Sequence, residues 1–181
     1  KHDFSNVKFK TKTMRKYLAI ALLFSLALTA CEKSDEEEKY NPAKTGIVGE
    51  WYSAGSDVAI LLSTYFSVDS IYAKFNDNNT YTVESYSQGA KTTMTGTYVQ
   101  AKSNVGAIWT ITLNQTTPTA LTSEGIFEIT LTSDKYVMRY EVVQTSPSIG
   151  ATPPTPAAGF GSSNGGALQT MNIQTYRMLV R

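Results

Sequence analysis

Three glutamates, Glu84, Glu128 and Glu141, are the carboxylates that could do acid–base chemistry, because each falls within a segment typical of a β-strand. In each segment the glutamate lies on the face opposite the apolar side chains, so we expect solvated surface carboxylates rather than a catalytic pair. The Asp77-Asn78-Asn79 sequence offers oxygen ligands but lacks the further spaced carboxylates of a calcium loop. No Gly-rich phosphate loop is found between a strand and a helix. The sequence therefore predicts no catalytic residue, metal or cofactor.

Cys31 is the only thiol and His2 the only imidazole among the 181 residues. One thiol cannot form an internal disulfide. Met14-Arg15-Lys16 precedes an uncharged apolar run at 18–28, which is typical of a secretory signal and too short to span a bilayer as a helix. Removal of residues 1–30 takes His2 with it. The remaining chain then cannot carry a His-dependent nucleophile or a zinc site built on His or Cys.

The Leu28-Thr29-Ala30-Cys31 sequence resembles the lipobox of bacterial lipoproteins. That resemblance implies cleavage before Cys31, a diacylglycerol on its sulfur and attachment to a membrane through this lipid. The alternative is a short buried helix that ends in an ordinary cysteine. Residues 1–13, upstream of Met14, are treated as an extension of the signal peptide.

The acidic run at 32–38 resembles the signal that sends some Gram-negative lipoproteins to the outer face of the outer membrane. We expect an outer-membrane protein on the cell surface, with the periplasmic face as the alternative, and a flexible tether over 31–45. Residues 1–30 hold six of the 16 Lys and Arg and one of the 15 acidic residues, so residues 31–181 keep ten and fourteen and carry a charge of about −4. This balance gives no electrostatic case for nucleic acid binding.

Residues 46–181 have the period-2 alternation of β-strands between turn signals. Eight strands are expected, at 47–53, 70–76, 80–87, 92–100, 105–114, 125–132, 136–143 and 170–180. Val58, Leu61, Leu62 and Tyr65 follow a helical spacing instead and predict a short helix over 57–66, capped by Ser56 or Asp57. The fold class is all-β: an eight-stranded antiparallel meander barrel with one short helix, with a two-sheet sandwich as the alternative.

Gly49-Glu50-Trp51 looks like the Gly-x-Trp start of lipocalins. The Phe-Asn-turn-Thr-Tyr segment at 75–82 and Gly96-Thr97-Tyr98 are similar to the lipocalin-like domains of bacterial surface lipoproteins. The resemblance covers 46–181 and implies that Trp51 plugs one end of the barrel, where an Arg near the last strand stacks on it. Arg177 and Arg181 are the candidates, although alternation places Arg177 on the face opposite Tyr176.

Strand alternation points nine aromatic rings inward: Trp51, Phe75, Tyr81, Tyr98, Trp109, Phe127, Tyr136, Tyr140 and Tyr176. We expect a packed end around Trp51 and a small cavity at the other end. Candidate ligand-binding residues are Tyr98, Trp109, Tyr140, Tyr176 and Phe160. Phe160 lies in the Pro- and Gly-rich stretch 144–168, which is either disordered or a contact loop at the barrel mouth.

A non-catalytic, membrane-anchored binding module for a small apolar or amphipathic molecule, or a glycan, is the leading functional hypothesis. The alternative is an accessory subunit that docks on an outer-membrane protein complex and binds no small molecule. An open, lined cavity would favour a ligand, and an exposed apolar patch would favour docking.

Overall fold

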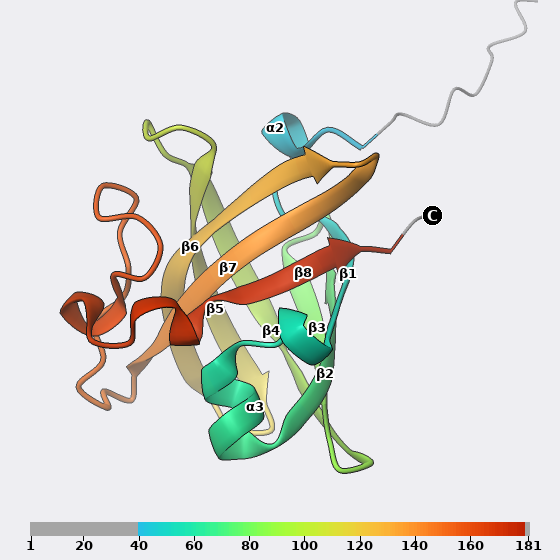
Figure 1. Ribbon diagram of the computed structural model, residues 1–181, viewed down its shortest axis with the longest axis vertical. Coiled ribbons are helices and arrows are strands. Elements are labelled where there is room, and N and C mark those ends of the chain that lie inside the picture. The colour runs from blue at the N-terminus through green and yellow to red at the C-terminus, as the bar shows by residue number, and fades with distance from the viewer. Residues whose placement is uncertain (1–39, 180–181) are drawn as a thin grey trace, which may run out of the picture. The chain divides into compact units, whose positions relative to one another are not determined.

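The computed structural model describes residues 40–179 (Figure 1). Its strands are β1 (Gly49–Ala54), β2 (Val68–Phe75), β3 (Thr80–Ser87), β4 (Ala90–Lys102), β5 (Ile108–Thr117), β6 (Leu121–Thr132), β7 (Lys135–Ser146) and β8 (Gln174–Met178). They form a closed antiparallel barrel in sequence order, in which β1 also pairs with β8. The predicted eight-stranded, lipocalin-like meander barrel is confirmed, and the two-sheet sandwich is not formed.

Alternation along the strands places the predicted inward side chains in one core. Trp51, Tyr98 and Phe127 are at most 1 % exposed. Of the nine aromatic residues predicted to face inward, only Trp109 and Tyr136 are half-buried, and both pack against this core. Period-2 patterning was therefore a sound guide to which face of each strand is buried.

Most strand boundaries differ from those predicted by one to four residues, and the latest starts relative to the prediction are those of β5 and β8. Residues 105–107 precede β5 in a turn, where Ser103 donates its backbone N–H to the Ile108 carbonyl oxygen and Gly106 has a φ of +53°. The segment 169–172 forms a 3₁₀-helix, η3 (Gln169–Asn172), so β8 begins later than expected. In both places the alternation of apolar residues continued into a turn. The prediction therefore extended the strand over residues whose backbone is not extended.

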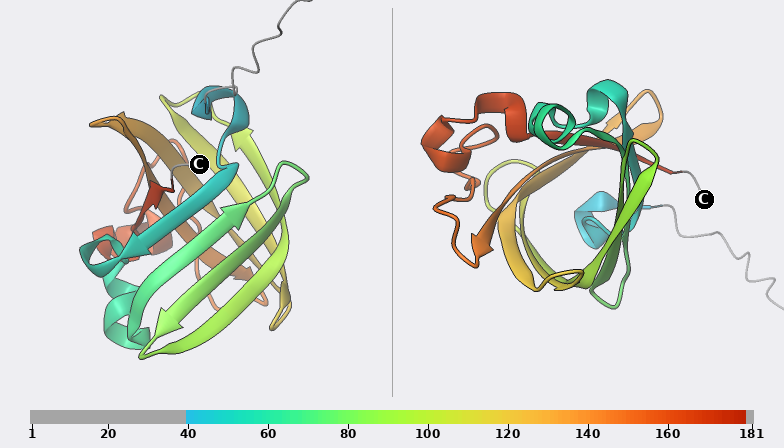
Figure 2. Two further views of the ribbon diagram at one scale, coloured as in Figure 1. Left: turned by 90° about the vertical axis from the view of Figure 1, so that its right-hand side faces the viewer. Right: turned by 90° about the horizontal axis from the view of Figure 1, so that it is seen from below.

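Trp51 closes one end of the barrel together with the chain just before β1. Its indole Nε1–H donates to the Ile47 carbonyl oxygen at 2.8 Å, and the Tyr40 ring meets it edge-on at 6.3 Å. The Gln100 side chain accepts from the Ile47 N–H and donates to the Thr45 carbonyl, which ties the short helix α2 (Pro42–Thr45) to β4. Seen from the opposite end, α2 lies across the far opening (Figure 2). The compact unit thus begins at Tyr40 rather than at residue 46.

The predicted helix over 57–66 is present but starts later. A 3₁₀ turn, η1 (Gly55–Asp57), leads into α3 (Ile60–Phe66), whose N-cap is Ala59 with no side-chain cap. The predicted cap, Asp57, instead receives Arg177 through two hydrogen bonds of 2.7 and 3.1 Å. Arg177 therefore faces outward and does not stack on Trp51, whereas Arg181 lies outside the described residues. The Ala59 N–H donates to the Gln174 side chain, which positions α3 at the open end of the barrel.

The connection between β7 and β8 is ordered and packs against the outside of the barrel, to one side of it in Figure 1. It contains η2 (Ser163–Gly166) and η3. Glu141, on the outer face of β7, is 0 % exposed and accepts hydrogen bonds from the Gly161 N–H at 2.6 Å and the Ser163 N–H at 3.1 Å. The prediction of a solvated Glu141 was wrong because this connection covers the outer face that alternation alone leaves to solvent.

The seam between β1 and β8 is the shortest ladder of the barrel. Only Trp51 with Met178 and Tyr52 with Arg177 are paired across it. The Leu179 N–H also donates to the Glu50 carbonyl oxygen at 2.9 Å, and the Gln174 amide donates to the Ser53 hydroxyl and to the Asp57 carbonyl oxygen. The last strand is thus joined to β1 by few backbone hydrogen bonds and by a small polar cluster.

Candidate functional site

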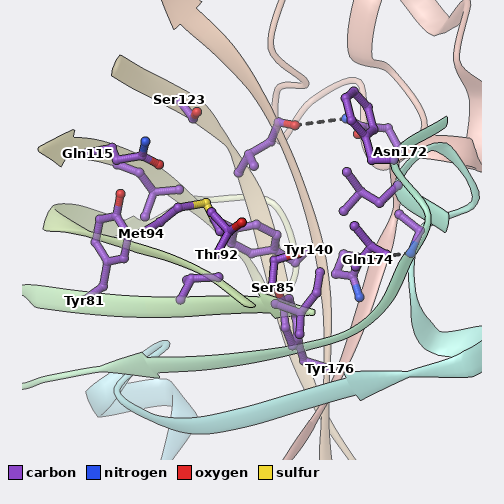
Figure 3. A pocket seen from close by; sticks show the side chains of 18 of the residues that line it. Tyr81, Ser85, Thr92, Met94, Gln115, Ser123, Tyr140, Asn172, Gln174 and Tyr176 are labelled. Carbon is purple, nitrogen blue, oxygen red and sulfur yellow. Dashed lines mark hydrogen bonds between the residues drawn. The ribbon is translucent and has the colours of Figure 1, made fainter. Parts of the chain in front are cut away.

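A cavity of about 530 Å³ opens at the end of the barrel opposite Trp51 (Figure 3). Inward side chains of β2 to β8 form its wall, and α3 and η3 border its mouth. Pockets of 300–1,000 Å³ are the usual size for binding a small molecule. The expected closed end and open end are both present, and the barrel is not filled by its own side chains.

The wall of the cavity changes character with depth. The mouth carries polar side chains, among them Ser85, Gln115 and Ser123, beside apolar side chains of α3. An apolar belt follows, formed by Ile71, Val83, Met94, Leu113 and Val142. The floor holds the hydroxyl groups of three tyrosines, Tyr81, Tyr140 and Tyr176. The lining is thus amphipathic.

Small inward residues keep the cavity open. Gly96 and Gly125 occupy inward positions on β4 and β6, where a Cβ atom would lie 2.1 and 1.9 Å from backbone oxygens of the neighbouring strands. Only glycine permits this close approach of the strands. Ala73 and Ser123 add further inward positions without large side chains. Large residues at these four sites would fill the barrel or push its strands apart.

No charged residue of the described chain lines the cavity. Burial raises the pKa of Tyr81 to about 12 and raises that of Tyr176 further. Burial also raises the pKa of Tyr140, with smaller contributions from Tyr176 and Tyr81 nearby. All three hydroxyls are therefore protonated at neutral pH and the cavity is uncharged.

The structure brings two of the five predicted ligand-binding residues together at the cavity. The rings of Tyr140 and Tyr176 meet edge-on at 5.9 Å on its floor. Tyr98 lies beneath the floor and donates its hydroxyl to the Asn76 carbonyl oxygen at 2.7 Å, and Trp109 stacks on Phe127 at 5.9 Å. Neither lines the cavity.

Phe160 lies outside the barrel, with its ring centre 4.2 Å from the guanidinium carbon of Arg139. No residue of 144–168 lines the cavity, so this segment is not a loop over the mouth. The residues that border the mouth are instead Leu62 and Phe66 of α3 and Asn172 of η3. The helical spacing predicted α3 but carried no information on which barrel end it borders.

Tyr81 was predicted to face inward but was not selected as a site residue. On β4 the inward residue paired with Tyr81 is Gly96, which has no side chain, whereas on β2 it is Phe75, which also lines the cavity. Gly96, opposite Tyr81 on the neighbouring strand, was the signal in the sequence that could have located the floor.

Among the described residues, the remaining polar groups form no second chemical site. Glu84 accepts hydrogen bonds from the Tyr86 hydroxyl at 2.6 Å and the Lys91 ammonium at 2.9 Å on the outer surface, and both contacts lower its pKa. Residues 40–179 contain no group of three His, Cys, Asp or Glu side chains able to hold a metal. No helix in that range is long and apolar enough to cross a membrane. Cys31 and the acidic run at 32–38 lie outside the described residues.

The chain matches no protein-family model, and comparisons with curated proteins and with solved structures found no similar protein.

Proposed function

We propose that this chain is a non-catalytic binding protein that holds a small apolar or amphipathic molecule inside its barrel. The observation that carries this proposal is the 530 Å³ cavity, open at one end and closed at the other by Trp51. Its apolar belt favours an amphipathic molecule over a glycan, because a glycan would leave hydroxyls unpaired against Ile71, Val83 and Leu113. Resemblance to lipocalins, suggested by Gly-x-Trp, agrees with such a role.

A fluorescent apolar probe tests this proposal directly. Neither tryptophan lines the cavity, so an added probe is a better reporter than intrinsic fluorescence. N-phenyl-1-naphthylamine should become fluorescent on binding the purified protein. The Ser85 side chain points into the cavity, so Ser85→Phe should abolish the fluorescence signal. Thr97→Phe, on the outer face of β4, is the matched control and should bind normally. Equal probe binding by both variants would contradict a site in the barrel.

We further propose that a lipid on Cys31 anchors the protein in the outer membrane and that the acidic run displays it on the cell surface. The lipobox resemblance and the glutamates at 36–38 support this location. Replacing these three glutamates with alanine should leave the protein in the membrane but reduce labelling of intact cells by an antibody. Unchanged labelling would favour another export signal. Absence of labelling in the wild type would favour the periplasmic face.

A second candidate function is docking on an outer-membrane protein. It is favoured by α3, which exposes Ile60, Tyr65 and Phe66 by 53, 69 and 64 %. Exposed large apolar side chains of this kind are used in protein interfaces. A photo-crosslinking residue at position 65 in intact cells should then give one discrete adduct. The same residue at Val99, which is 64 % exposed on β4, is the control.

A further inference from the structure

Three tyrosine hydroxyls at the cavity floor have no hydrogen-bond partner within the described residues. Tyr81, Tyr140 and Tyr176 come from β3, β7 and β8, and their side chains are 4, 8 and 6 % exposed. Every fully inaccessible side-chain nitrogen or oxygen in the described chain has a partner, so these hydroxyls are open to the cavity. Tyr98 and Tyr136 differ, since their hydroxyls donate to the carbonyl oxygens of Asn76 and Tyr40.

Buried polar groups are normally paired, because burial without a partner costs free energy. Nine-tenths of each tyrosine is already buried, while its hydroxyl faces an enclosed space. Among the described residues that line the cavity, the most deeply buried hydroxyls without a partner thus lie at its floor, beyond the apolar belt.

The same region contains no compensating charge. No Asp, Glu, Lys, Arg or His is found among the lining residues, nor between Val142 and Tyr176, which covers the β7–β8 connection and the start of β8. An ionised head group brought to the floor would lose its hydration without gaining a counter-ion. The floor is therefore suited to an uncharged polar group.

We propose that the cavity takes an uncharged amphiphile, such as a long-chain alcohol, with its oxygen-bearing end at the floor. The unpaired tyrosine hydroxyls of the floor offer hydrogen bonds to that oxygen, while the belt around Val83, Met94 and Leu113 contacts the hydrocarbon. This inference rests on the proposed function and adds the ligand's charge state and its direction of insertion. Because the tyrosines stay protonated at neutral pH, each is able to donate as well as accept.

Three competitors of equal chain length test the proposal. Purified protein is loaded with N-phenyl-1-naphthylamine and titrated with 1-decanol, decanoate or decane. 1-Decanol should displace the probe at least about fivefold more strongly than either of the others, since one hydrogen bond contributes about 1 kcal/mol. Stronger displacement by decanoate would overturn the inference that the ligand is uncharged. Equal displacement by decane and 1-decanol would overturn the role of the hydroxyls.

Phenylalanine variants locate the effect. Tyr81→Phe, Tyr140→Phe and Tyr176→Phe should each weaken 1-decanol binding about fivefold while binding of decane is unchanged. Tyr136→Phe removes a hydroxyl from the plugged end and should bind as the wild type does. Urea unfolding shows that the variants are folded. Unchanged 1-decanol affinity in all three floor variants would overturn the inference.

The outcomes separate this inference from the proposed function. If the wild type binds the probe but shows no preference for 1-decanol, only the ligand class and its direction fail. If the folded wild type binds neither the probe nor any of the three competitors, the proposed function fails and the inference fails with it.

Discussion

Glu141 and Ser163 are joined by a hydrogen bond of 3.1 Å from the Ser163 N–H to the Glu141 carboxylate, on the outside of the barrel. The Ser163 hydroxyl donates to the same carboxylate, and Gly161 donates its N–H to it at 2.6 Å. A single buried acid thus organises a connection of more than 20 residues that its Pro and Gly content would otherwise leave irregular.

Glu141→Ala should lower the free energy of unfolding by about 2–4 kcal/mol, because two buried N–H groups lose their acceptor. Urea denaturation measures this change. Glu128→Ala, on the outer face of the neighbouring strand β6, is the control and should stay within about 0.5 kcal/mol of the wild type. Amide hydrogen exchange at Gly161 and Ser163 should accelerate in Glu141→Ala. Unchanged exchange would mean that other contacts hold the connection.

Trp51→Ala should destabilise the barrel by about 3–5 kcal/mol, since it empties a fully buried site at the plugged end. Trp51→Phe keeps most of the packing and loses the hydrogen bond to the Ile47 carbonyl oxygen, so its cost should be smaller, about 1–2 kcal/mol. Chemical unfolding of the two variants gives the comparison. Equal costs would show that the hydrogen bond, rather than the volume of the ring, dominates.

Alkaline pH should destabilise the fold through Tyr81. Its folded-state pKa of about 12 exceeds the ordinary value of 10.0, so the unfolded chain releases this proton first. The contribution is complete below pH 10 and is lost between pH 10 and 12, by up to about 1.4 kcal/mol per pH unit. Urea unfolding at pH 9 and pH 11.5 should show a smaller loss for Tyr81→Phe than for the wild type. An identical loss would argue against the raised pKa.

Cys31→Ala should accumulate as an uncleaved precursor without acyl chains, because the lipobox would lack its modified residue. Intact-mass measurement and detergent phase partitioning distinguish the two forms. Ser34→Ala, three residues further on, should remain cleaved and lipidated. A wild-type protein of normal cleavage but without lipid would contradict the anchor.

Strand alternation predicted the barrel and most of its inward faces, because one side of every strand packs against a shared core. It failed at Glu141, since burial of an outward residue depends on a distant connection that has no period of its own. Tyr140 and Tyr176 were correctly placed at the cavity, but Tyr98 and Trp109 were not. How deep an inward side chain lies along the barrel axis depends on the strand register and on small residues such as Gly96 and Gly125. Alternation gives the face of a strand but not this depth.

The short ladder between β1 and β8 has a mechanical consequence. With two paired positions across it, this seam has the least backbone resistance to separation, and the Gln174 cluster lies where it meets the mouth. We expect local breathing there, visible as rapid amide exchange in β8 and slow exchange in β6 and β7. Local opening of this one seam would let the cavity widen for ligands of different width, while the other seven ladders remain intact.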